Sequence, residues 1–254
     1  TVGRYGNRTY NYFSSQYNTY SGGYVPRGQY IGDMEFQRCR PTEYTYAVFD
    51  NVNDSRMWKT FKTVYGICNN VATPDYVKAE NAPTFGDQGV LFLLNKKDDT
   101  RFRKDEFGRA AIKHTFVNPE TGKWVPNVAP VYAEGQYVMN TYGTSAANRS
   151  NMFCGINKTA DGSRTGEKGD AHRDVTMARV GETYLVKAEC QVRNGDDAGA
   201  LATINLLRKR AEWKAGEDRE YYVDGTIAFK SNSTASGNCA KGNKDANGAK
   251  LTNQ

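Results

Sequence analysis

The clearest hydrophobic pattern in the chain lies between residues 173 and 212. In the first half of this segment, apolar residues recur every three or four positions, as they do on one face of an α-helix. These positions are Met177, Val180, Tyr184, Ala188 and Gln191/Val192. The second half repeats the spacing with Leu201, Ile204, Leu207 and Ala211. Two amphipathic helices are therefore expected here.

Residues at the ends of these two segments predict how the helices begin and end. Asp174 is placed to cap the first helix, and Asn194-Gly195 supplies the left-handed residue that commonly ends one. Asp196-Asp197 then offers a cap and favourable charge for the second helix. Its last turns carry Arg208-Lys-Arg210, where the helix dipole favours cations. The segment is predicted to be an antiparallel helical hairpin.

Elsewhere the apolar residues come in short pieces separated by turn-forming residues. Val90–Leu94 predicts a buried strand, and Glu43–Phe49 alternates as a half-buried strand does. The segment 54–61 fits a helix or an extended segment equally well. Further short elements are expected within 107–117 and 128–139, with a long connection over 140–170.

Composition shows how thin the aliphatic content is. Leu, Ile, Val and Phe make up 43 of the 254 residues, which is below the ~20% level at which disorder is suspected. A disordered chain would also have a high net charge and few aromatic rings, whereas this one has a net charge of +6 with 17 Tyr, 11 Phe and 3 Trp. The chain is expected to fold, with much irregular structure or with part of its core outside the printed sequence.

Charge and cysteine spacing argue against several classes of protein. The basic residues are scattered, so no nucleic-acid partner is expected. The longest apolar run, Gly89–Leu94, is far shorter than the ~18 residues that indicate a membrane-spanning helix. The five cysteines stand far apart without a C-x-x-C pair, which argues against a zinc site. We expect no metal and no cofactor.

The hairpin also carries a recognisable signature. It reads RDVTMARVGETYLVKAE over residues 173–189, followed by Gly195-Asp, Ala200, Ile204-Asn205 and Arg208-Lys-Arg-Ala211. This pattern resembles the SusD/RagB family. Asp54-Ser-Arg56 and Gly155-Ile-Asn157 stand where that family usually has an Asp-x-Arg element and a variable run-in.

The resemblance implies a mainly α-helical, SusD-like fold with tetratricopeptide-like helical hairpins, long loop-rich excursions and a few short strands. The chain would be part of one such domain, with a loop-rich, ligand-presenting region over 1–172, the hairpin over 173–212 and a loop or tail over 213–254. The family's lipid-bearing cysteine, first helical repeats and last conserved region are absent from the printed sequence. Because about three or more such hairpins must stack to bury their apolar faces, further repeats are expected outside this chain.

The resemblance also implies a function. Members of the family are surface-exposed lipoproteins of the outer membrane that bind nutrients and perform no chemistry. They present glycans, and sometimes peptides, to a SusC-like TonB-dependent transporter. For this chain we therefore expect glycan or peptide binding at the cell surface, a SusC-like partner, a lipid anchor outside the printed sequence and no catalytic residues.

The candidate ligand-binding residues lie mainly in a tyrosine-rich stretch near the N-terminus. A sugar offers C–H faces and a rim of hydroxyls, so its receptor needs flat aromatic area beside polar groups. The candidates are Tyr17, Tyr20, Tyr24, Arg27 and Trp124, the last in a turn-like context. The alternative is that the tyrosines pack against loop backbones and fill a core that is poor in aliphatic residues.

Two rival functions start from other features. Glu182 and Glu189 lie seven residues apart on one helix face, about 10 Å by the helical rise, a separation that suits an inverting glycosidase. Pairing with Arg179 and with arginines of the second helix favours a structural role for them instead. His114 and His172 are isolated, so a hydrolytic triad has little support. The remaining alternative is a helical-repeat scaffold that binds another protein.

Overall fold

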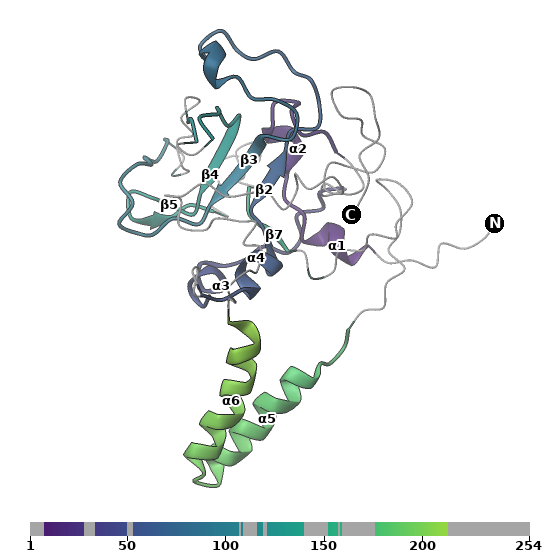
Figure 1. The fold of residues 1–254 in the computed structure, drawn as a ribbon, viewed down its shortest axis with the longest axis vertical. Helices are drawn as coiled ribbons and strands as arrows, with labels where there is room; N and C mark the ends of the chain where they lie inside the picture. The colour runs from purple at the N-terminus through teal and green to yellow at the C-terminus, as the bar shows by residue number, and fades with distance from the viewer. Residues whose placement is uncertain are drawn as a thin grey trace, which may run out of the picture.

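The computed structural model describes residues 8–27, 34–49, 53–106, 108, 116–118, 121–139, 152–156, 158 and 176–212. Figure 1 shows these residues as two parts. One is a body of short helices and strands, and the other is a hairpin of two longer helices that projects from the body.

The centre of the body is a three-stranded sheet with the strand order β2-β3-β4. Strand β2 (Val64–Gly66) pairs antiparallel with β3 (Gln88–Leu93), and β3 pairs parallel with β4 (Asn127–Pro130). All residues of β3 are buried, as expected for a strand that is covered on both faces. The buried strand predicted at Val90–Leu94 is confirmed.

Two shorter pairs of antiparallel strands complete the sheets that the structure describes. They are β1 (Phe61–Lys62) with β7 (Gly155–Ile156), and β5 (Tyr132–Ala133) with β6 (Gln136–Tyr137). Glu134 and Gly135 join β5 to β6 with φ values of 49° and 71°. Positive φ at both positions is typical of a tight hairpin turn whose twist matches the strands.

The helices of the body are each about one turn long. They are α1 (Thr9–Tyr12), α2 (Tyr17–Tyr20), α3 (Glu43–Ala47), α4 (Arg56–Thr60) and the 3₁₀ helix η1 (Ala79–Asn81). The segment 54–61, which the sequence left open, contains both possibilities, because α4 leads directly into β1.

The strand predicted at Glu43–Phe49 is wrong, because most of this segment is helix α3. Thr42 caps the helix: its hydroxyl accepts a hydrogen bond from the Thr45 backbone N–H at 3.3 Å. The backbone N–H of Thr42 in turn donates to the Thr45 hydroxyl at 3.3 Å. This reciprocal capping box stabilises a helical turn, and it outweighs the alternating pattern of apolar residues.

The expectation of a mainly α-helical fold is wrong for the described residues. The helices of the body have only four or five residues, apart from the three of η1, and its core is organised around strands. The apolar residues of the core come in short β-branched and aromatic runs such as Val64-Tyr65 and Val90–Leu93. Such runs pack well on a pleated sheet, whereas stacked helical repeats need apolar residues at helical spacing. The observed fold is a mixture of α and β elements.

The predicted helical hairpin is present as α5 (Val180–Arg193) and α6 (Asp197–Ala211). Gly195 has a φ of 78° in the turn, which confirms the left-handed residue expected there. Asp196 caps α6, since its carboxylate accepts a hydrogen bond from the Gly199 backbone N–H at 2.8 Å. Helix α5 begins later than the pattern starting at Met177 predicted, and the expected cap, Asp174, lies outside the described residues.

Small residues bring the two helices of the hairpin together. Ala188, Ala200 and Thr203 are buried, and the Thr203 hydroxyl donates to the side-chain oxygen of Gln191 at 2.7 Å. Much of the remaining apolar surface is exposed: Val180, Leu185, Val186, Val192, Leu201 and Leu206. This exposure is typical of a helical repeat unit, whose apolar face needs a neighbouring element.

Gly89 of β3 allows a close approach of neighbouring chains in the core. A Cβ atom at this position would lie 2.5 Å from Cγ2 of Val25 and 3.1 Å from Cγ1 of Ile67. We expect Gly89→Ala to lower the free energy of unfolding by about 1–3 kcal/mol through overpacking, measured by urea denaturation. Gly181→Ala is the control, because its Cβ would meet only ordinary contact at 3.8 Å. An unchanged stability of the Gly89 variant would contradict the packing described.

Candidate functional site

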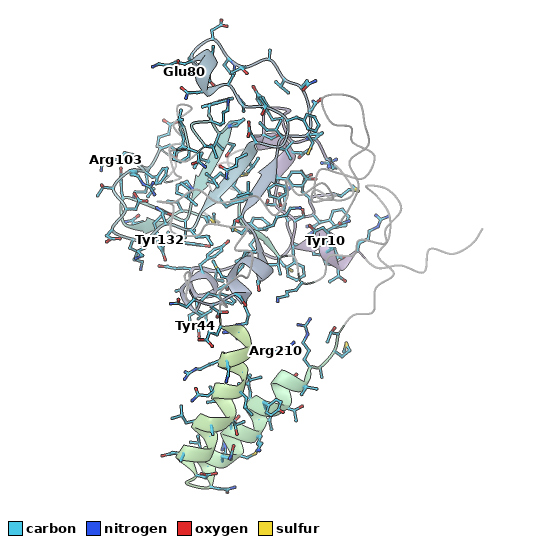
Figure 2. The ribbon with its side chains drawn as sticks, in the orientation of Figure 1. Tyr10, Tyr44, Glu80, Arg103, Tyr132 and Arg210 are labelled. Atoms are coloured by element: carbon cyan, nitrogen blue, oxygen red, sulfur yellow. The ribbon has the colours of Figure 1, made fainter. Side chains whose placement is uncertain are left out.

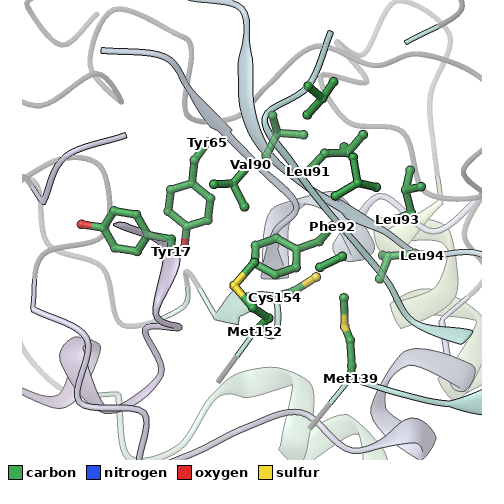
Figure 3. Close-up of a cluster of buried hydrophobic side chains, with 14 of the residues drawn as sticks. Tyr17, Tyr65, Val90, Leu91, Phe92, Leu93, Leu94, Met139, Met152 and Cys154 are labelled. Carbon is green, nitrogen blue, oxygen red and sulfur yellow. The ribbon is translucent and has the colours of Figure 1, made fainter. Parts of the chain in front are cut away.

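Tyr17, the first of the predicted ligand-binding residues, lies in the core. Its ring has no solvent exposure and stacks on the ring of Tyr65 in β2, with centroids 4.5 Å apart and planes at 7° (Figure 3). Burial also raises the pKa of Tyr65 well above its ordinary value. The ring of Tyr17 therefore offers no surface to a ligand. The side chain of Tyr20 lies outside the described part of the structure.

Tyr24 and Trp124, two further candidates, meet in space although they lie far apart in the sequence. Their ring centroids are 5.9 Å apart, with the planes at 75°, and both residues are buried. The Tyr24 hydroxyl donates to the backbone oxygen of Ala72 at 3.0 Å. Burial raises the pKa of Tyr24, so the phenol keeps the proton that it donates.

Tyr76 adds an exposed ring to this pair. Its ring packs edge-on against Trp124, with centroids 6.1 Å apart and planes at 82°, and the residue is 58% exposed. An edge-on contact of this kind stabilises a ring while leaving most of its surface open. We call Tyr24, Trp124 and Tyr76 the aromatic platform, in which two buried rings support one that reaches solvent.

Backbone and side-chain hydrogen bonds hold the loop that carries Tyr76. The Trp124 backbone N–H donates to the oxygen of Asn81 at 2.9 Å, and the Asn81 side chain donates to the oxygen of Gly122 at 2.7 Å. The ammonium group of Lys123 donates to the oxygen of Ala82 at 3.0 Å. These bonds tie the C-terminal end of the loop to the segment around Trp124, and the ring contact with Trp124 supports Tyr76 itself.

Charged groups stand on the same loop as Tyr76. Lys78 and Glu80 are well exposed, with the ammonium nitrogen and a carboxylate oxygen 3.7 Å apart. Figure 2 shows Glu80 at the end of the body opposite the hairpin. The loop therefore combines an exposed aromatic ring with hydrogen-bonding groups, which is the combination that a sugar needs.

Arg27, the remaining candidate, is held by an ion pair. Its guanidinium group contacts the Glu35 carboxylate at 2.5 Å through Nη2 and at 3.0 Å through Nε. The Glu35 side chain is almost fully buried, and it also accepts a hydrogen bond from the backbone N–H of Asn18 in α2 at 3.3 Å. Arg27 therefore anchors α2 to the segment that follows Tyr24.

Sequence reasoning missed Tyr76. It follows Thr73-Pro-Asp75 in a polar loop, and the Val77 backbone N–H donates to the oxygen of Pro74 at 2.9 Å, which closes a turn. Pro74 and Asp75 are typical turn residues and mark the loop. Nothing in the local pattern shows that the loop brings Tyr76 to Trp124, because that contact depends on the tertiary fold.

A small pocket beside α3 is the other candidate for a binding site. It has a volume of about 230 Å³ and aromatic walls formed by Tyr46, Phe49 and Tyr132, with Lys97 at its rim. The Lys97 ammonium lies 2.8 Å from the Glu43 carboxylate, and this hydrogen bond raises the pKa of Lys97. The charge of Lys97 is therefore already paired, and the volume is below the ~300 Å³ of typical small-molecule pockets. The aromatic platform is the stronger candidate.

The glutamates that invited a comparison with glycosidases lie on the projecting hairpin. Glu182 and Glu189 are both exposed on α5. Glu189 is paired with Arg193 of the same helix, at 2.6 Å and 3.0 Å, and not with an arginine of the second helix as expected. His114 and His172 lie outside the described residues.

Among the described residues, no three His, Cys, Asp or Glu side chains gather as a metal site would require. Within the same residues, no helix is long and apolar enough to cross a membrane.

Comparison with protein families identifies the chain. The SusD family model matches residues 2–241, so the chain belongs to the SusD family. Proteins of this family are generally nutrient-binding proteins associated with the outer membrane at the cell surface, not enzymes, and they work with SusC-like transporters. A comparison with curated proteins found no match, and a comparison with solved structures found none either.

Proposed function

We propose that this protein captures an oligosaccharide or polysaccharide at the cell surface and delivers it to a SusC-like, TonB-dependent transporter in the outer membrane. A lipid anchor outside the printed sequence would attach it to the membrane. The protein would perform no chemistry on the glycan. Family membership supports the general role, and the aromatic platform supports glycan as the nutrient.

The observation that carries this proposal is the exposed ring of Tyr76 on a rigid aromatic support. A pyranose ring packs its C–H face against an aromatic side chain, and a fixed ring loses little entropy when it does so. Tyr76 is supported by Trp124 and the loop by hydrogen bonds to residues 122–124. Lys78 and Glu80 supply hydrogen-bonding groups on the same loop.

The five residues selected from the sequence take different parts in this proposal. Tyr24 and Trp124 support the binding surface from behind, since both are buried, Trp124 contacts Tyr76 and Tyr24 contacts Trp124. Tyr17 packs α2 against Tyr65 of β2, and Arg27 anchors α2 to the segment that follows Tyr24. Tyr20 remains a candidate for direct contact.

Replacing Tyr76 with alanine tests the platform. We expect Tyr76→Ala to weaken the binding of a glycan ligand by about ten- to thirty-fold, because the loss of an aromatic anchor costs about 1.4–2 kcal/mol. Isothermal titration of each purified protein with the same oligosaccharide measures this change. Urea denaturation should show little change in stability, because the ring is mostly exposed.

Tyr44→Ala is the matched control. Tyr44 is a tyrosine of α3 that is 75% exposed and lies where the hairpin meets the body, far from Glu80 (Figure 2). This variant should bind the oligosaccharide as tightly as the unaltered protein. An equal loss of affinity in both variants, or no loss in the Tyr76 variant, would rule out the platform as the binding surface.

A further inference from the structure

A larger cavity lies at the junction between the hairpin and the body. It has a volume of about 600 Å³ and opens between the C-terminal half of α6 and the residues around α4. Its lining includes the cations Arg56, Arg208 and Lys209, the amides Asn53 and Asn205, and the apolar Val48. We call it the junction cavity. Its volume falls within the ~300–1,000 Å³ typical of small-molecule sites.

Arg56 is fixed at the cavity by a bidentate ion pair. Its Nε and Nη2 atoms contact the two oxygens of the Asp54 carboxylate at 2.9 Å and 2.6 Å. This hydrogen bonding raises the pKa of Arg56 above its ordinary value. The Nη1 atom makes no hydrogen bond to any residue that the structure describes. The N–H groups of Arg56 that do not bind Asp54 are therefore held in a fixed position, where they can donate to a ligand.

Arg208 and Lys209 bring two more cations to the cavity. Neither forms an ion pair with a carboxylate among the described residues, and Arg208 makes one long hydrogen bond, at 3.4 Å, to the Asn205 side chain. Because Asp54 is paired with Arg56, Glu212 is the one carboxylate among the described lining residues that remains to balance these two cations. The described lining therefore has an excess of positive charge.

The end of helix α6 does not need these two side chains as caps. The backbone N–H and the hydroxyl of Ser55 both donate to the oxygen of Ala211, at 2.9 Å and 3.0 Å. The oxygen of Arg208 accepts a hydrogen bond from the Glu212 N–H at 2.8 Å. Basic residues at this end are favoured by the helix dipole, but the dipole requires neither a cavity nor the two amides that line it.

The junction cavity also has an apolar part of its lining. Val48 is 52% exposed although it is apolar, and Ala211 lines the same cavity. A sugar unit that carries a negative charge combines a C–H face, hydroxyls and an anionic group. The cavity offers an apolar surface, amides and cations that match these three features in turn.

We propose that the junction cavity binds a sugar unit carrying a carboxylate or a sulfate group, with Arg208 and Lys209 as the anion-binding residues. This inference rests on the proposed function in taking the ligand to be a glycan. The cavity lies where α6 meets the body, and Glu80, on the loop that carries Tyr76, lies at the opposite end of the body (Figure 2). The two sites can therefore be tested with separate variants.

The test compares three probes on the full chain by isothermal titration. They are a trisaccharide of galacturonic acid, a sulfated trisaccharide of galactose, and the unmodified trisaccharide of galactose. The double variant R208Q/K209Q should lose about tenfold or more of its affinity for the anionic probe that binds, because it loses two charge-assisted contacts. Raising the salt concentration should weaken that binding in the unaltered protein. Whichever anionic probe binds identifies the carboxylate or the sulfate as the recognised group.

The matched control is K187Q/R210Q, which removes the same charge from the same hairpin at residues that do not line the cavity. Its affinity should stay within about twofold of that of the unaltered protein, since long-range effects of exposed charges are small. Equal losses in the two double variants would overturn the proposal, because they would show attraction to the net charge alone.

Two other results would also overturn it: no binding of either anionic trisaccharide, and, in the Tyr76→Ala protein, binding of the neutral trisaccharide as tight as that of the anionic ones. If Tyr76→Ala still weakens the binding of a neutral glycan in that case, only the junction cavity is refuted. If the unaltered protein binds no glycan at all, the proposed function fails as well.

Discussion

Tyr17→Ala is expected to lower the free energy of unfolding by about 3–5 kcal/mol, the loss typical of removing a large aromatic ring from a core. The ring of Tyr17 is fully buried and stacked on Tyr65, which packs in turn against Phe92 of β3 with centroids 6.1 Å apart. Its removal would leave a cavity beside the central sheet. Urea denaturation monitored by fluorescence measures the change.

Tyr17→Phe and Tyr44→Ala are the controls for this prediction. The phenylalanine variant keeps the stacked ring and should lose no more than about 1.5 kcal/mol, the value of one hydrogen bond. Tyr44→Ala removes an exposed ring and should change stability by about 0.5 kcal/mol or less. A Tyr17→Ala protein that keeps its stability but loses glycan binding would show that Tyr17 contacts the ligand directly.

Trp124→Ala is expected to reduce both stability and glycan affinity. The indole ring contacts Tyr24 on one side and Tyr76 on the other, so its loss should cost about 3–5 kcal/mol of stability. In the fraction that remains folded at low temperature, Tyr76 would lose its support. Glycan affinity should therefore fall about as far as it does in Tyr76→Ala, as measured by titration beside a denaturation curve.

A double-mutant cycle separates support from direct contact. Trp124→Phe keeps a smaller ring and should weaken glycan binding moderately. If Trp124 acts through Tyr76, the double variant with both Trp124→Phe and Tyr76→Ala should bind the glycan no more weakly than the single variant Tyr76→Ala. Fully additive losses would contradict this view, because they would mean that Trp124 binds the glycan independently.

The elements that the sequence predicted correctly are those set by local interactions. The hairpin follows from apolar residues at helical spacing and from Gly195 and Asp196 in the turn, whose roles depend on residues three or four positions away. Strand β3 follows from its continuous apolar run. In α3, by contrast, two local signals compete, and the Thr42–Thr45 capping box determines the outcome.

The contacts that build the candidate site are not local, and the sequence could not show them. Trp124 lies far along the chain from Tyr24 and Tyr76, so these rings meet only in the tertiary fold. Tyr17 and Tyr65 are likewise brought together by the tertiary fold. These rings also explain how a chain poor in aliphatic residues forms a core, since buried tyrosine, phenylalanine and tryptophan side chains fill much of it. The structure thus favours the packing alternative for Tyr17.

The central claim is that this member of the SusD family binds glycan, and the most direct measurement is affinity electrophoresis of the unaltered protein through gels that contain a broad panel of neutral and acidic polysaccharides. At least one polysaccharide should retard the protein, and where that polysaccharide is neutral, Tyr76→Ala should restore much of the mobility while Tyr44→Ala does not. Unchanged mobility in every gel, together with binding of an oligopeptide library by titration, would contradict the account and identify a peptide as the nutrient.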